Sequence, residues 1–155
     1  NLGSAYLQKG DKENALIHLK KSATLYPYPI NLYNLGLVYE LMGNGQEAKG
    51  FYYKAFNAKN LAQNNQHISA IYLRLAWMLI LSDEPETAKD VLKEGLRYYP
   101  NDAALLYELA MSEYLLCNKG EALIAAERAQ ELLPNGQHYQ LYKTILDNRP
   151  LNLTN

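Results

Sequence analysis

The feature that most constrains this chain is an internal repeat. Four alanines recur along the sequence at separations of 33, 40 and 34 residues: Ala15, Ala48, Ala88 and Ala122. A proline lies twelve residues after three of them, at Pro27, Pro100 and Pro134, and Asn60 occupies the fourth such position. A period in this range indicates a stack of similar units in which each unit contacts only its neighbours.

Each unit contains two segments with apolar residues at i, i+3, i+4 and i+7, the pattern of amphipathic helices. Short breakers separate the two segments, such as Gly10 and Gly43, and Pro85 suits the first turn of a helix. No segment alternates with period two, so we expect no strands. We predict helices over residues 1–9, 12–25, 29–42, 45–60, 66–81, 84–98, 102–115, 119–132 and 136–147.

At these positions the chain resembles the tetratricopeptide repeat, whose 34-residue pattern runs W-x2-L-G-x2-Y, then A-x3-F, then P. The second unit matches it at Leu32, Leu35-Gly36, Tyr39, Ala48 and Tyr52. The first unit matches at Leu2-Gly3, Tyr6, Ala15, Leu19 and Pro27, and the third at Tyr72, Leu75-Ala76, Leu79, Ala88, Leu92 and Pro100. The fourth is weaker, because Glu113 stands where an aromatic residue is expected. The resemblance implies an all-α, right-handed superhelical solenoid of helix-turn-helix repeats with a C-terminal capping helix.

The repeats divide the chain into successive segments. We predict repeats at about 1–28, 29–60, 68–101 and 102–135, a capping helix over 136–147, and a polar tail over 148–155. The second unit is longer than the others, and its surplus falls around 60–67, where we expect a lengthened helix end or a loop. The chain opens inside its first repeat without an initiator Met, so we expect a piece of a longer protein.

Composition excludes several classes of function. Fifteen Lys and Arg against sixteen Asp and Glu give a net charge of -1, which lacks the basic excess that binding to nucleic acid requires. No apolar run approaches the ~18 to 20 residues of a membrane helix, so no direct membrane insertion is expected. The single cysteine, Cys117, cannot form an internal disulfide or a zinc site, and we predict a small buried thiol.

The chain lacks the residue clusters that carry catalysis. His18, His67 and His138 lie in different units and form no metal-binding motif. Lysines that recur on the second helices, among them Lys89 and Lys93, are predicted to form a solvated outer face. We therefore expect no enzyme activity, no cofactor and no metal.

The first helix of each hairpin carries a second apolar stripe. In the third unit, Leu73 and Trp77 lie on a different face from Tyr72 and Leu75. By resemblance, first helices line the concave surface of the solenoid, and Tyr and Trp are frequent at binding hot spots. Packing between successive hairpins is the alternative role. The predicted partner-binding groove comprises Tyr33, Leu37, Leu73, Trp77, Tyr107, Met111 and Tyr114, with Asn34 and Arg74 as polar contacts at its side.

The family's clamp for a C-terminal carboxylate is mostly absent. Asn34 and Arg74 occupy matching places, but Ser4 and Ala70 stand where Asn and Lys would be needed. We therefore predict a protein-protein interaction scaffold that binds a partner peptide or helix in an apolar, aromatic groove. The alternatives are a substrate-docking or accessory domain of a larger enzyme or of a protein-export or membrane assembly, and a self-association module that forms a homo-oligomer.

Overall fold

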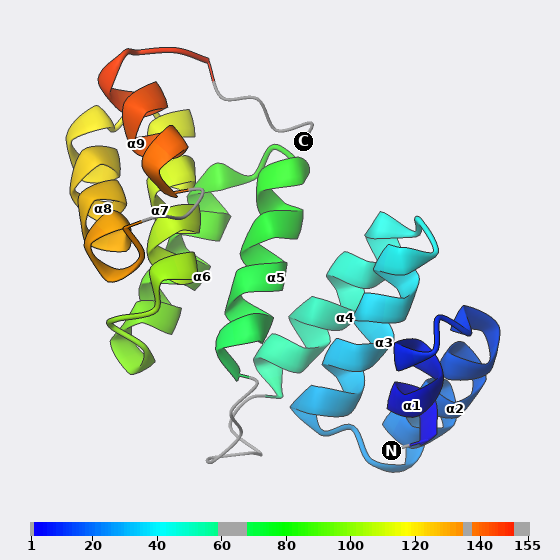
Figure 1. The fold of residues 1–155 in the computed structure, drawn as a ribbon. Helices are drawn as coiled ribbons and strands as arrows, with labels where there is room; N and C mark the ends of the chain where they lie inside the picture. Colours follow the sequence, from blue (N-terminus) through cyan, green and yellow to red (C-terminus); the bar gives the residue numbers. More distant parts are fainter. Residues whose placement is uncertain (1, 59–67, 135–137, 151–155) are drawn as a thin grey trace. The chain divides into compact units, whose positions relative to one another are not determined.

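The computed structural model describes residues 2–58, 68–134 and 138–150, and in these ranges the only regular secondary structure is helical (Figure 1). The helices are α1 (Leu2–Gln8), α2 (Lys12–Leu25), α3 (Pro29–Leu41), α4 (Gly45–Asn57), α5 (Ile68–Leu81), α6 (Pro85–Tyr98), α7 (Ala103–Leu115), α8 (Lys119–Leu132) and α9 (His138–Leu146). Every predicted helix is present. The surplus predicted around 60–67 lies outside the described residues.

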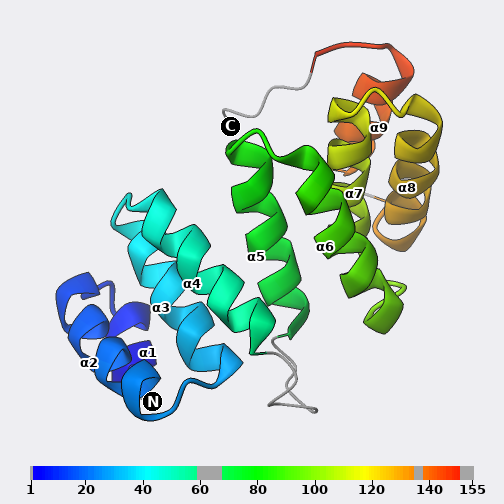
Figure 2. The same ribbon diagram turned by 180° about the vertical axis from the view of Figure 1, so that it is seen from behind.

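The chain divides into two compact units, and the boundary falls inside α5. Unit 1 is Asn1–Ile71 and contains the hairpins α1/α2 and α3/α4. Unit 2 is Tyr72–Asn155 and contains most of α5, then α6, the hairpin α7/α8 and α9. In unit 2, α9 packs beside α8 and also contacts α7 (Figure 2).

The first helix of each hairpin ends in the same turn. One residue takes the left-handed conformation, at Gly10, Gly43, Asp83 and Cys117, with φ of 78°, 78°, 60° and 62°. The N–H of the next residue then donates to a carbonyl five positions back, as Asp11 does to Tyr6 at 3.0 Å and Asn118 to Glu113 at 2.8 Å. This is the Schellman arrangement, which satisfies carbonyls that the helix end leaves without partners.

The turn explains why the prediction of a buried thiol at Cys117 is wrong. Cys117 follows the end of α7, at the repeat position that Gly10 and Gly43 occupy, and its side chain is exposed. Cysteines are buried on average in proteins, but at this position the left-handed turn of the backbone determines the exposure of the side chain. The predicted helices over 102–115 and 119–132 already placed Cys117 in the turn between them.

In unit 1, small residues let the two helices of a hairpin approach closely. A Cβ added to Gly36 would lie 2.6 Å from Cε1 of Tyr52, and one added to Gly3 would lie 2.6 Å from Cγ of Leu19. Tyr52 and Leu19 are fully buried as a result. The glycines of the repeat pattern therefore make room for a large side chain on the facing helix.

Unit 2 uses the same principle with the glycine on the second helix. A Cβ added to Gly95 of α6 would lie 3.0 Å from Cγ of the buried Tyr72 of α5. In the next hairpin the positions equivalent to Gly36 and Tyr52 are both small. They are Ala110 and Ala126, and both are buried. Leu141 and Ile145 of α9 are also buried, which shows that this helix covers apolar surface of its own unit.

Candidate protein-interaction faces

The predicted groove residues divide between the two units. We call Tyr33, Asn34 and Leu37 of α3 the unit 1 face. All three are partly exposed. The ring of Tyr33 lies 5.7 Å from that of Tyr52 and packs beside a buried cluster, so this tyrosine is half core and half surface. The Asn34 amide donates to Ser4 Oγ of α1 at 3.1 Å, which fixes its orientation.

The unit 2 face comprises Leu73, Arg74 and Trp77 of α5 and Tyr107, Met111 and Tyr114 of α7. Five of these six are partly exposed, and Met111, at 5% exposure, is buried. The Tyr114 hydroxyl donates to the backbone carbonyl of Arg149 at 2.9 Å, so the segment after α9 already engages one residue of the face. Trp77 keeps part of its surface exposed although Leu75 and Leu79 of the same helix are fully buried.

The sequence analysis missed one residue of this face, Glu108 of α7. It occupies the same repeat position as Asn34 and Arg74, at the separations of 40 and 34 residues that also relate the last three repeat alanines. Its Oε2 atom is buried and has no hydrogen-bond partner among the described residues. Burial raises the pKa of Glu108 to about 7, against the opposing charge of Arg74.

The charge of Glu108 also affects the pKa of Tyr107, its neighbour on α7. Burial raises the pKa of the Tyr107 hydroxyl, and the adjacent Glu108 carboxylate raises it further. The unit 2 face therefore combines aromatic surface with an acidic group and a basic group. The repeat register was the signal that could have identified Glu108, since it aligns the residue with two polar positions already selected.

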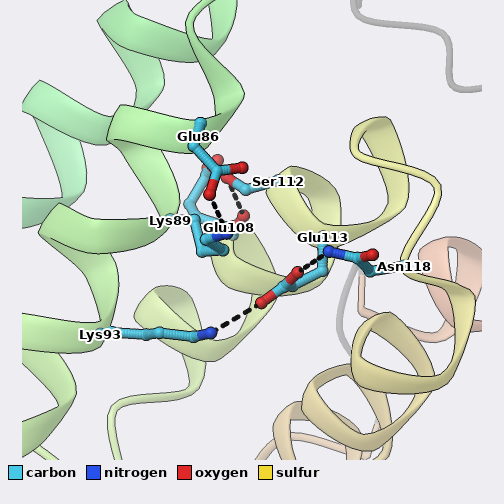
Figure 3. A network of polar contacts seen from close by, with 7 residues as sticks. All are labelled: Glu86, Lys89, Lys93, Glu108, Ser112, Glu113 and Asn118. Atoms are coloured by element: carbon cyan, nitrogen blue, oxygen red, sulfur yellow. Dashed lines mark hydrogen bonds and ion pairs between the residues drawn. The ribbon is translucent and has the colours of Figure 1, made fainter.

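A second polar cluster joins α6, α7 and Asn118, the residue before α8 (Figure 3). Glu113 is 2% exposed, and its carboxylate accepts from Lys93 Nζ at 3.0 Å and from Asn118 Nδ2 at 2.8 Å. Burial raises the pKa of Glu113, but the hydrogen bonds from Asn118 and Lys93 outweigh it and hold the pKa below its usual value. The buried Glu113 carboxylate is thus held by two donors from other elements.

The lysines of α6 form the solvated face predicted from the sequence only in part, because Lys93 is half-exposed whereas Lys89 is mostly covered. Lys93 is bound to buried Glu113, and the side chain of Lys89, 14% exposed, pairs with Glu86 one turn earlier. Lys93 thus reaches a carboxylate of the next hairpin, whereas Lys89 pairs within its own helix.

The described residues contain no group of three or more His, Cys, Asp or Glu that could hold a metal ion. His18 stacks on Tyr6, with ring centroids 5.2 Å apart. His67 and the side chain of His138 lie outside the described part. Within the described ranges, no helix combines the length and apolarity needed to cross a lipid bilayer.

The described fold is an all-α helical repeat solenoid. Two models of the tetratricopeptide repeat match the sequence, one over residues 1–29 and the other over residues 28–101. The chain belongs to the tetratricopeptide repeat family. Comparison with curated protein sequences gives no match.

Solved structures share this fold at low sequence identity. MamA from Desulfovibrio magneticus RS-1 is 21% identical with a TM-score of 0.81, over 96% of this chain and 81% of that one. YrrB, described as a tetratricopeptide repeat protein with an unusual peptide-binding site, is 20% identical with a TM-score of 0.78, over 94% and 73%. The first repeat domain of Spaghetti, solved bound to the HSP90 peptide SRMEEVD, is 17% identical with a TM-score of 0.70, over 79% and 93%.

These likenesses concern the fold. The repeat is generally a non-catalytic scaffold, and two of these neighbours are described as binding peptides. The fold of this chain is accordingly that of a protein-interaction scaffold.

Proposed function

We propose that this chain is a non-enzymatic scaffold that binds an apolar peptide or helix of a partner protein on the first-helix faces of its hairpins. The observation that carries the proposal is the partial exposure of large aromatic side chains at corresponding repeat positions. Tyr33 of α3 and Tyr107 of α7 occupy one such position, and Trp77 of α5 lies one helical turn further along.

Energetics support a binding role for these residues. An aromatic side chain that remains partly exposed on a helix whose other stripe is fully buried gives up burial it could otherwise contribute to folding. A partner that covers Trp77 would recover that stabilisation in the complex. Tyr and Trp also present large contact area at low entropy cost, which is why they dominate binding hot spots.

The direct test replaces Trp77 by Ala and compares binding with stability. The probe is a phage-displayed library of random peptides, selected on the wild-type chain and then measured against the variant. We expect Trp77→Ala to weaken the selected peptides by about 30-fold, equivalent to ~2 kcal/mol, while the free energy of unfolding falls by less than about 2 kcal/mol.

The matched control is Tyr98→Ala, which removes an aromatic residue 65% exposed on the second helix of the same hairpin. Binding should be unchanged in that variant. Peptides that bind Trp77→Ala as well as the wild type, or a loss of stability of ~3 to 5 kcal/mol, would remove Trp77 from the face and assign it to the core.

A further inference from the structure

The burial of the Glu108 carboxylate opposes folding. Its carboxylate lies on α7 beside the partly exposed Tyr107, and its Oε2 atom is buried without a hydrogen-bond donor among the described residues. A buried acceptor that lacks a donor forfeits the hydration it had in the unfolded chain. The repeat does not fix a carboxylate at this position, since Asn34 and Arg74 occupy it in α3 and α5.

The charged group that acts on Glu108 from a neighbouring helix is Arg74 of α5, in the same unit. Its positive charge favours the ionised carboxylate, yet burial outweighs it and the pKa stays near 7. Arg74 therefore compensates the carboxylate only in part. A further cation at this point would be stabilised by a charge that the folded chain leaves incompletely neutralised.

We infer that Glu108 selects the partner by charge: the segment that docks on the unit 2 face carries a lysine or arginine that donates to the Glu108 carboxylate, and acidic segments are disfavoured. This inference rests on the proposed function, since it names the chemistry of the partner bound at that face. Glu108 is itself partly exposed, so a donor can approach, and rotation about the terminal torsion exchanges its two oxygens.

The same geometry disfavours acidic partners. A carboxylate docked beside Glu108 would add a like charge in a partly desolvated site, and binding would then require a proton. The binding of a cationic partner is instead linked to the loss of a proton, because the partner binds the ionised form and Glu108 releases the proton that it holds near neutral pH. Arg74 is the charged group that lowers the pKa of this carboxylate, and Tyr107 is the neighbour whose pKa the carboxylate raises; both keep their charge state between pH ~6 and ~8.

In the test, peptides are selected from the random phage-displayed library on the wild-type chain at about pH 8, where Glu108 is ionised. We expect the selected peptides to be enriched in Lys and Arg relative to the library. Their affinity should fall at least ~10-fold in Glu108→Gln, which keeps the size of the side chain and removes its charge. Acidification to about pH 6 should weaken the same peptides on the wild type and leave Glu108→Gln unaffected.

The matched control is Glu47→Gln, which removes one negative charge from an exposed position of α4 in unit 1. It should bind the selected peptides like the wild type. Because Glu108→Gln removes a poorly compensated buried charge, its stability at about pH 8 should equal or exceed that of the wild type, so a loss of binding cannot be attributed to unfolding.

The outcomes separate the inference from the proposed function. Selected peptides without excess basic residues, or with equal affinity for Glu108→Gln, overturn the charge selection, and the proposed function survives if Trp77→Ala still weakens them. If the wild-type chain selects no peptides, or if Trp77→Ala has no effect, the proposed function fails and the inference fails with it.

Discussion

The two units build the same hairpin-to-hairpin contact from different chemistry. In unit 1, Lys20 Nζ of α2 lies 5.6 Å from the ring of Tyr39 on α3, and that ring stacks on Phe51 with centroids 5.3 Å apart. In unit 2, Lys93 of α6 occupies the repeat position of Lys20, and buried Glu113 of α7 occupies that of Tyr39. The lysine is common to both contacts, and its partner is a π face in one and a carboxylate in the other.

The carboxylate is accompanied by one further sequence difference, and it is held by a second donor. Ala125 stands in unit 2 at the repeat position of Phe51, so the ring that stacks on Tyr39 has no counterpart at that position. Asn118, the residue that precedes α8, makes no side-chain capping bond and donates to Glu113 instead. Its counterpart in the α3/α4 hairpin of unit 1, Asn44, is the same residue and likewise makes no side-chain capping bond. A buried charge is tolerated here because two donors replace the water it has lost.

The largest effect on stability is expected from a substitution in the contact of unit 1. Tyr39→Ala removes a partly buried ring that packs against Phe51 and under Lys20, and we expect a loss of about 3 kcal/mol in the free energy of unfolding. Urea denaturation measures it. Tyr26→Ala, which removes a tyrosine 58% exposed, is the control and should lose less than about 1 kcal/mol. Equal losses in the two variants would show that the aromatic stack does not hold the hairpins together.

The corresponding change in unit 2 is Glu113→Ala, for which we expect a loss of about 2 kcal/mol near neutral pH. It leaves the Asn118 amide without its acceptor and Lys93 without its partner, although Lys93 is half-exposed and can regain water.

The pH dependence distinguishes the two contacts. The folded-state pKa of Glu113 lies below its ordinary value of 4.5, so its stabilisation is present above pH 4.5 and is lost as pH falls through the folded-state pKa. The deficit of Glu113→Ala should therefore shrink on acidification below pH 4.5, whereas that of Tyr39→Ala should not. A deficit of Glu113→Ala that is independent of pH would mean that lost packing, and not the charge, explains it.

The fold could be predicted from the sequence because the repeat pattern contains pairs of positions, one small and one large, whose residues face each other across a hairpin. Gly36 and Tyr52 belong together sterically, and each recurs with its counterpart, Gly3 with Leu19 and Ala76 with Leu92. Helix periodicity and the turn residues then gave the ends of the helices. A single copy would not have sufficed, since each position alone has many explanations.

The polar clusters could be predicted only in part. Glu113 was recognised as a departure from the pattern, but its partner Lys93 lies in another hairpin and its second donor depends on the direction of the Asn118 side chain. Local periodicity does not encode contacts of that range. Glu108 is polar and so belongs to none of the apolar stripes that predict the groove. The burial of Met111 depends on neighbouring helices, which a stripe on one helix does not reveal.

The turns extend the comparison between the units. In unit 1 both left-handed positions are glycines, and Gly43→Ala should cost about 1 kcal/mol, because the added Cβ strains a backbone at φ 78°. Gly50→Ala is the control, since Gly50 lies in α4 with nothing within 4 Å of the added Cβ. That variant should gain up to ~1 kcal/mol from helix propensity. Thermal or urea unfolding of the pair checks the sign, and a stabilising Gly43→Ala would contradict the role assigned to the turn.

The smallest effect is the reverse change in unit 2, where Cys117 and Asp83 hold the left-handed conformation without being glycines. Cys117→Gly relieves a strain of ~1 to 2 kcal/mol and loses ~0.5 to 1 kcal/mol through the greater freedom of glycine in the unfolded chain, so the net gain should be about 0.5 kcal/mol. The thiol is exposed, so no packing is lost. Cys117→Ala keeps the Cβ and therefore the strain, and urea midpoints measured under reducing conditions should rank Cys117→Gly above both Cys117→Ala and the wild type. Equal midpoints for the two variants would show that the α7/α8 turn relaxes around its Cβ, and that the glycines of unit 1 are not needed for this turn.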